Sequence, residues 1–112
     1  MDEIAVLEAD LDDPAHAAAT LDLVDDYARD AFGAGRGLAA EVRDELVSGL
    51  RAHPTTVVFL AFAGGIPAGV AVCFRGFSSF AARPLLNVHD LSVRAPFRGR
   101  GIARRLLDAV EE

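Results

Sequence analysis

The feature that most constrains this 112-residue chain is a turn rich in glycine and arginine near its C-terminal end. Residues 98–101 read Arg-Gly-Arg-Gly. Residues 85–93, just before the turn, are typical of a strand in which polar residues interrupt an apolar run. After the turn, apolar residues recur at helical spacing along residues 102–112. The pattern predicts a strand, a tight turn and a helix in direct succession.

A turn of this kind is suited to bind an anion. The first four N–H groups of a helix have no partner within the helix, and the helix dipole adds partial positive charge there. Gly99 and Gly101 lack a Cβ, so the main chain can approach a ligand closely, and Arg98 and Arg100 add full charges. The arrangement favours a phosphate or pyrophosphate. The alternative is an ordinary glycine turn with solvated arginines.

The charge distribution also points to this segment. The formal net charge of −6 and the pI near 4.9 argue against a nucleic-acid-binding protein, which would normally have a basic face. Ten of the 17 acidic residues lie among the first 30 residues, whereas five of the 11 arginines lie within residues 94–105. A short basic segment in an acidic chain is a candidate anion site.

The composition limits the class of protein. An apolar share of 52% and a charged share of 25% are typical of one small globular domain. No apolar run is long enough to span a membrane, and the acidic N-terminus has no secretory signal pattern. The only cysteine, Cys73, excludes an internal disulfide and a cysteine-built zinc site. We therefore expect a cytoplasmic protein without a bound metal, in which Cys73 is an inert core residue.

The rest of the chain divides into regular elements. The apolar patterns predict a strand over residues 4–9, helices over 14–32 and 38–52, and strands over 56–63 and 68–77. Gly64-Gly65 predicts a hairpin between the last two of these strands. Residues 33–37 are expected to form a flexible link, and residues 75–84 a loop or a frayed strand end.

Residues 98–103, Arg-Gly-Arg-Gly-Ile-Ala, match the R/Q-x-x-G-x-G/A signature of the GNAT superfamily of N-acetyltransferases. The chain resembles that family in topology over its whole length and in specific residues over 86–110. The resemblance implies an α/β fold with a mixed, mainly antiparallel sheet flanked by helices, in the order β-α-α-β-β-β-α. Residues 1–112 would then form a single, partial GNAT domain that lacks the C-terminal strands of the family.

The resemblance also implies a site for acetyl-CoA as co-substrate, without a metal. The main-chain amides near Leu91, Ser92 and Val93 would bond the pantetheine arm and the thioester carbonyl. A second group of residues would hold the pyrophosphate: Arg98, Gly99, Arg100, Gly101, Ile102 and Ala103. In the family a tyrosine from the C-terminal part often protonates the departing thiolate, and the only tyrosine here is Tyr27, in the first predicted helix.

GNAT enzymes transfer the acetyl group directly to an amine, which must lose its ammonium proton to a base. His89 and Asp90 are the candidate catalytic residues. Strand alternation would place their side chains on opposite faces, and a β-bulge, common in this strand of the family, would change which one faces the cleft. The alternatives are a structural role for Asp90 and, for His89, a strand histidine that is exposed or hydrogen-bonded within the protein.

The expected function is an N-acetyltransferase that moves the acetyl group of acetyl-CoA to a primary amine of a small molecule or protein. The alternatives are a truncated GNAT-like module that binds CoA or a partner chain without catalysis, and an interaction domain whose anion site is incidental. The acidic residues of the first helix are a solvated face or would attract a cationic acceptor.

The chain ends inside a predicted helix without a stop signal, so we expect a domain that is cut short. The strand over residues 86–93 would then keep one edge unpaired. Such an edge predicts a homodimer or a swapped oligomer. It also predicts weak or no transferase activity for this chain alone.

Overall fold

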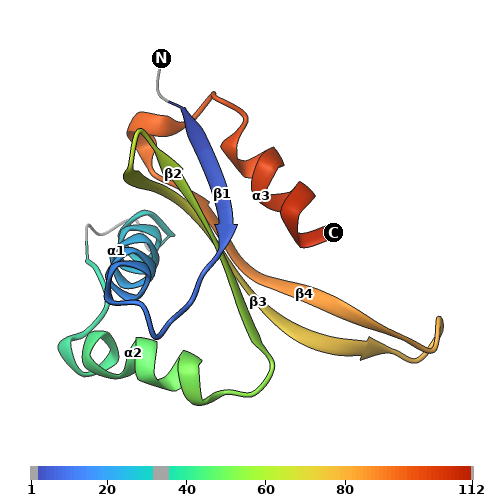
Figure 1. The fold of residues 1–112 in the computed structure, drawn as a ribbon. Coiled ribbons are helices and arrows are strands. Elements are labelled where there is room, and N and C mark those ends of the chain that lie inside the picture. Colours follow the sequence, from blue (N-terminus) through green and yellow to red (C-terminus); the bar gives the residue numbers. More distant parts are fainter. Residues whose placement is uncertain (1–2, 32–35, 112) are drawn as a thin grey trace.

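The computed structural model describes residues 3–31 and 36–111. In chain order these form β1 (Ile4–Glu8), α1 (Pro14–Ala31), α2 (Ala40–Ala52), β2 (Thr56–Ala63), β3 (Ile66–Ser78), β4 (Arg83–Val93), a short 3-10 helix η1 (Ala95–Phe97) and α3 (Ile102–Glu111) (Figure 1). The predicted order β-α-α-β-β-β-α is confirmed, with η1 as an addition. Most of the predicted link over residues 33–37, and the predicted helix ends at Phe32 and Glu112, lie outside the described residues.

The four strands form one antiparallel sheet in the order β1-β2-β3-β4. Helices α1 and α2 cover one face of the sheet, and α3 covers the other (Figure 1). The predicted α/β class with a mainly antiparallel sheet is therefore confirmed. None of the described helices is long and apolar enough to cross a membrane.

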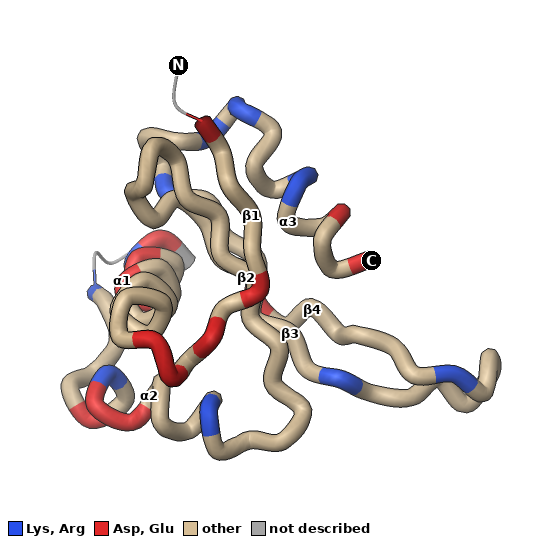
Figure 2. Tube along the Cα trace, viewed as in Figure 1, with Lys and Arg blue, Asp and Glu red and all other residues tan. Residues whose placement is uncertain are grey.

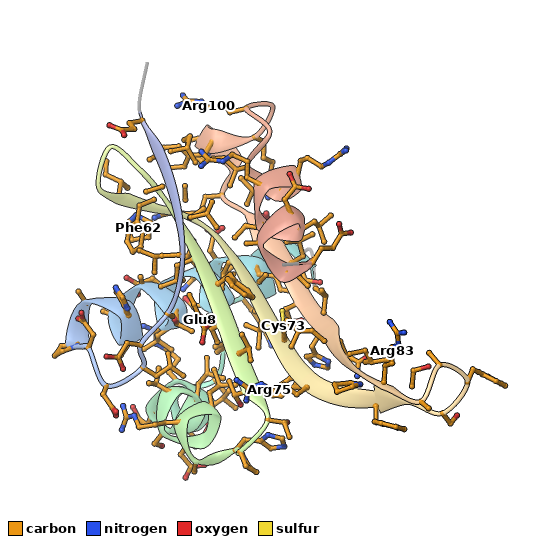
Figure 3. All side chains as sticks on the ribbon, turned by 45° about the vertical axis from the view of Figure 1, so that its right-hand side comes forward. Glu8, Phe62, Cys73, Arg75, Arg83 and Arg100 are labelled. Atoms are coloured by element: carbon orange, nitrogen blue, oxygen red, sulfur yellow. The ribbon has the colours of Figure 1, made fainter. Side chains whose placement is uncertain are left out.

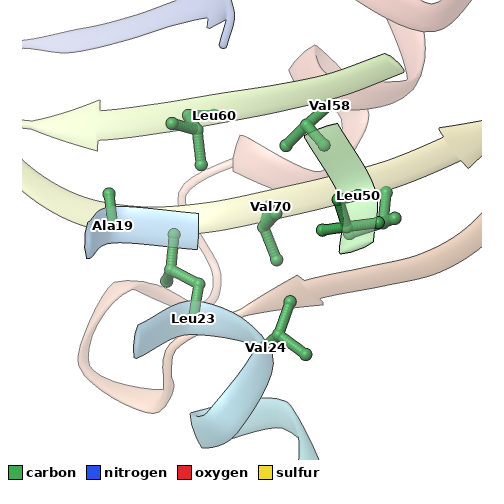
Figure 4. Close-up of a cluster of buried hydrophobic side chains, with 8 residues drawn as sticks. Ala19, Leu23, Val24, Leu50, Val58, Leu60 and Val70 are labelled. Atoms are coloured by element: carbon green, nitrogen blue, oxygen red, sulfur yellow. The ribbon is translucent and has the colours of Figure 1, made fainter. Parts of the chain in front are cut away.

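The sheet separates two apolar cores. On one face, Leu23 and Val24 of α1 and Leu50 of α2 pack over the side chains of β2 and β3 (Figure 4). On the other face, Ile102 and Leu106 of α3 are fully buried against small residues. These small residues of β2 and β3 include Ala61, Ala63, Ala68, Ala71 and Cys73.

Close packing fixes the position of α3. A Cβ at Gly69 of β3 would lie 3.1 Å from Cδ1 of Leu106 and 3.2 Å from Cγ2 of Ile102, so any larger residue would require these side chains to shift. Arg105 also donates a hydrogen bond of 2.7 Å to the carbonyl oxygen of Ile4 in β1. The start of α3 is thereby held beside the end of β4.

The prediction of a loop or a frayed strand end over residues 75–84 is wrong for most of this segment, because only residues 79–82 form a turn. Strand β3 continues to Ser78 and β4 begins at Arg83, and the two form an arm that projects from the body of the molecule (Figures 1 and 3). The arm exposes Phe77 and Phe80. Its strands stay paired through main-chain hydrogen bonds, which need no buried face, so the mixed side-chain pattern gave no strand signal.

The buried carboxylate of Asp25 joins α1 to the residues just before α2. Only 7% of Asp25 is exposed, although the acidic residues of this helix were expected on a solvated face. Its Oδ1 accepts the N–H of Leu38 at 2.7 Å, and its Oδ2 accepts Arg43 at 2.8 Å and Arg29 at 3.2 Å. The Leu38 N–H above all, and then the two guanidinium groups, lower the pKa of Asp25, although burial opposes the shift. A Cβ at Gly37 would lie 2.2 Å from Oδ1.

Replacing Asp25 by Asn is expected to lower the free energy of unfolding by about 1–3 kcal/mol at pH 7, because charge-assisted hydrogen bonds are lost. The folded state lowers the pKa, so this contribution is complete above the pKa of Asp25 in the unfolded chain. It disappears as the pH falls through the folded-state pKa. Urea unfolding between pH 7 and strong acid should therefore show a flatter pH dependence in the variant.

Asp22→Asn is the matched control, because Asp22 is exposed on the same helix. It should leave both the stability at pH 7 and its pH dependence close to the wild-type values. Equal acid sensitivity of the wild type and Asp25→Asn would contradict the prediction.

Candidate functional site

The segment between β4 and α3 has the strand–turn–helix geometry that its sequence predicts. After η1, the chain turns through Gly99 and Gly101, whose φ angles of 82° and 78° lie in the left-handed region. Glycine adopts this region without the steric cost that a Cβ brings. The carbonyl oxygen of Gly101 accepts the N–H of Arg105 at 3.1 Å, which closes the first turn of α3. The N–H groups that begin α3 have no partner within the helix.

Two neighbouring hollows lie along this segment. One, of about 130 Å³, lies at the glycine turn and the start of α3. The other, of about 480 Å³, lies between α1 and the end of β4. Val93 and Arg98 line both. Eight of the nine residues predicted to bind the coenzyme line one hollow or the other: Leu91, Ser92, Val93, Arg98, Gly99, Gly101, Ile102 and Ala103.

Arg100 is the predicted coenzyme residue that lines neither hollow. Its guanidinium group lies over the ring of Phe97, 5.5 Å from the ring centroid. Figure 3 shows Arg100 at the turn that leads into α3. Arg100 therefore places its positive charge beside the glycine turn.

The main chain of β4 presents alternate N–H groups to the open edge of the sheet. The Arg94 N–H donates to Ala68 of β3 at 2.8 Å. Because successive residues of a strand point their N–H groups to opposite sides, the Ser92 N–H also faces β3. The N–H groups of Leu91 and Val93 face the open edge instead. Of the three predicted amide donors, these two are oriented away from the sheet.

A β-bulge determines how the two candidate catalytic residues lie. The register of β3 and β4 changes from Val72 opposite Asp90 to Cys73 opposite Val88, so His89 is the extra residue. Val72 belongs to the core under α1 and α2, and the Asp90 opposite it therefore lies on the same face.

The ring of His89 contacts Phe74, which packs against the same core, at 5.7 Å between ring centroids. His89 and Asp90 thus lie on one face, whereas alternation alone would separate them. His89 is exposed and Asp90 is partly buried. The bulge brings an imidazole and a carboxylate to the same side of β4.

The structure adds residues to the site that the sequence did not indicate. Tyr27 and Asp30 of α1 line the larger hollow with the end of β4. His53, at the end of α2, contacts the ring of Phe74 with 5.2 Å between ring centroids, so His53 and His89 contact the same phenyl ring. The one local signal is that Tyr27 and Asp30 are three residues apart and share a helix face.

Charge is divided between α1 and the turn before α3 (Figure 2), and Asp30 and Arg98 bring the two signs to the larger hollow. Figure 2 shows acidic positions gathered on the β1–α1 connection, α1 and α2, and basic positions at the turn before α3 and along its start. Arg98 spans the two sides, since its Nη2 pairs with Asp30 of α1. Its Nε donates to the carbonyl oxygen of Val93 at 2.8 Å.

Two other kinds of site, a metal centre and a reactive cysteine, find no support in the described part of the chain. Residues 3–31 and 36–111 contain no group of three or more side chains that could hold a metal ion. Cys73 is buried in the core under α3, where burial raises the pKa of its thiol. This placement agrees with the expected inert core cysteine.

The sequence model of the Acetyltransferase (GNAT) family matches residues 19–112. The chain belongs to this family. The match covers α1 from residue 19 onward, every later described element and both hollows, and it confirms the resemblance first seen at residues 98–103. GNAT acetyltransferases take their acetyl group from acetyl-CoA. No curated protein matches the sequence.

Solved structures share the fold at low sequence identity. The ribosomal-protein-alanine N-acetyltransferase of Brucella melitensis biovar Abortus 2308 is 19% identical, with a TM-score of 0.74 over 97% of this chain and 69% of that chain. An integron cassette protein from the mobile metagenome of V. cholerae is 18% identical, with a TM-score of 0.78 over 96% and 65%. An aminoglycoside N-acetyltransferase in complex with CoA is 16% identical, with a TM-score of 0.72 over 99% and 68%. This GNAT chain thus spans about two thirds of the length of each.

Replacing Gly101 by Ala is expected to destabilise the GNAT chain by about 1–2 kcal/mol, because a Cβ is strained in the left-handed region. No heavy atom lies within 4 Å of a Cβ at this position, so the loss would come from the backbone and not from a clash. Gly49 is the matched control, since its Cβ would also meet open space, but it lies inside helix α2.

Gly49→Ala is expected to stabilise the protein by about 0.5–1 kcal/mol. Urea unfolding measures both variants. Effects of the same sign would contradict the assignment of Gly101 to a strained turn.

Proposed function

We propose that this chain carries the acetyl-CoA site of a GNAT N-acetyltransferase, which moves the acetyl group directly to a primary amine of a small molecule or protein. The observation that carries the proposal is the glycine turn before α3. Its two left-handed residues and the free N–H groups at the start of α3 form an anion-binding arrangement in the segment that has the family signature. The reaction would take place within a single domain whose coenzyme motif covers residues 86–110.

The pyrophosphate would lie at the glycine turn. The fit is supported by the open space around Gly99 and Gly101, where a Cβ would meet no heavy atom within 4 Å. The N–H groups of residues 99–103 would bind the phosphate oxygens, with Ile102 and Ala103 supplying the helix end. Arg100 would contribute long-range attraction from its position over Phe97.

The pantetheine arm would follow the open edge of β4. Leu91 and Val93 turn their N–H groups to this edge, where they would donate to the amide and thioester carbonyl groups. Such donors also stabilise negative charge that develops on a carbonyl oxygen. Ser92 would contact the pantetheine arm through its side chain, because its own N–H faces β3. Acetyl-CoA supplies an activated acetyl thioester at this position.

The proton of the acceptor amine would be removed at the β-bulge. An amine attacks a thioester only in its uncharged form, so a base must accept the ammonium proton, directly or through water. The bulge sets His89 and Asp90 on one face of β4, next to the residues that would hold the thioester. One of the two side chains would act as the base, and the other would orient it or the amine.

A module that binds CoA or a partner chain without catalysis is the second candidate. The observation that favours it is the outer edge of β4, which has no partner strand among the described residues. In this alternative the turn still binds the diphosphate, but no amine is acetylated. Both candidates fit a cytoplasmic location, because Cys73 is a free thiol.

Calorimetric titration with acetyl-CoA tests the shared part of both candidates. Saturable binding is expected, and Gly101→Val should abolish it, whereas Gly49→Ala should keep it. Thiol release with a panel of primary amines then separates the two, since only the enzyme consumes acetyl-CoA in an amine-dependent way.

If thiol release is observed, Asp90→Asn or His89→Gln should lower kcat by about 10²-fold or more, because general base catalysis contributes about 10²–10⁴-fold. Absence of acetyl-CoA binding would overturn the proposal. Binding without amine-dependent thiol release would leave the non-catalytic module.

We further propose that the open edge of β4 before the bulge, residues 83–88, pairs with a second copy of the chain, which leaves the N–H groups of Leu91 and Val93 to the coenzyme. Light scattering at tens of micromolar should then give a mass above that of the monomer. Lysine on an edge strand opposes such pairing, so Val88→Lys should shift the protein toward the monomer. Val88 is 38% exposed on β4, and Val42→Lys, at a residue 46% exposed on α2, is the matched control. A monomeric wild type would contradict the pairing.

A further inference from the structure

Arg98 joins three parts of the molecule that are far apart in the sequence. It belongs to the turn, its Nε donates to the Val93 carbonyl oxygen at 2.8 Å, and its Nη2 pairs with Asp30, 68 positions earlier. Val93 is the last residue of β4, and Asp30 lies in the last turn of α1. One guanidinium group therefore links the turn to the end of the strand and to the end of the helix.

The location of Asp30 is unfavourable for a carboxylate by itself. The C-terminal end of a helix carries partial negative charge, which repels an acidic side chain in the last turn. Arg98 offsets this repulsion by a charge-assisted hydrogen bond. Asp30 and Arg98 both line the larger hollow, so their ion pair lies at the wall of the proposed coenzyme site.

The directions of the Arg98 bonds favour one of two roles. Its side chain lines both hollows, so its orientation shapes the boundary between them. Both of its hydrogen bonds go to protein groups at the α1 and β4 side of the turn. This geometry suits a group that braces the turn from behind, while the main-chain N–H groups stay directed to the ligand.

We propose that Asp30 is a positioning residue of the coenzyme site. It holds Arg98 as a brace between α1 and the turn, and the brace keeps the glycine turn in its anion-binding shape. Arg98 thus acts through the main chain of the turn, and its guanidinium group is not a phosphate ligand. The inference rests on the proposed acetyl-CoA site.

The opposite role predicts an effect of opposite sign. If Arg98 were a phosphate ligand, Asp30 would compete with the phosphate for the guanidinium group. Removing the carboxylate would then release Arg98 and tighten the binding of acetyl-CoA. If Asp30 is a positioning residue, its removal loosens the turn and weakens binding.

The decisive experiment is calorimetric titration of acetyl-CoA into the wild type and Asp30→Asn at low ionic strength, where exposed charges are least screened. The Kd should rise about two- to fivefold, in keeping with a half-exposed ion pair. Asp30→Glu, which keeps the carboxylate, should stay near the wild-type value. Arg98→Gln should weaken binding, and adding Asp30→Asn to it should cause no further loss.

Asp22→Asn is the control for loss of a negative charge on α1. Asp22 is exposed and lies eight residues earlier, about 12 Å along the helix axis. This variant should bind acetyl-CoA as the wild type does, or slightly more tightly. Binding by Asp30→Asn that is as tight as, or tighter than, that of Asp22→Asn would overturn the inference.

A measurement without ligand keeps the inference separate from the proposed function. Amide hydrogen exchange over residues 94–103 of the free chain should be faster in Asp30→Asn than in the wild type and in Asp22→Asn. Unchanged exchange would overturn the brace even if acetyl-CoA binds. Failure of the wild type to bind acetyl-CoA would instead overturn the proposed function, and faster exchange would still establish the brace.

Discussion

The packing of α3 on a face of small residues is the interaction on which the site depends. Ile102 and Leu106 are buried in the first two turns of the helix, against strands whose buried residues on this face include four alanines and Cys73. This close contact holds the start of α3 at the end of β4. The left-handed residues Gly99 and Gly101 then connect the two elements within a few residues. An anion-binding helix end is useful only where its position is fixed in this way.

On the opposite face of the sheet, charged residues of α1 help to hold the site together. Asp25 holds the residues just before α2 by accepting the N–H of Leu38, and Asp30 pairs with Arg98 at the wall of the larger hollow. Both carboxylates lie on α1, and both are balanced by arginines from other parts of the chain. The acidic helix is therefore not only a solvated surface. It closes one side of the proposed coenzyme site.

Several features follow from local patterns and were predicted correctly. The order of elements and the glycine turn need only periodicity and glycine geometry, whereas the coenzyme role of the residues around the turn stays a prediction. The arm around Phe77 was missed, because its strands pair without a buried face. The sequence left undecided which face of the sheet His89 and Asp90 occupy, because the placement of a bulge depends on the partner strand. Tyr27 was not assigned to the site, because no motif connects α1 to β4.

The sequence by itself determined the family, the α/β class and the main chain of the proposed phosphate site, since these depend on neighbouring residues and on local backbone preference. The tertiary structure decided which side chains surround that main chain. His53 and His89 meet at one phenyl ring, and Arg98 meets Asp30 across 68 positions. Such contacts arise from the packing of whole elements, and no local pattern encodes them.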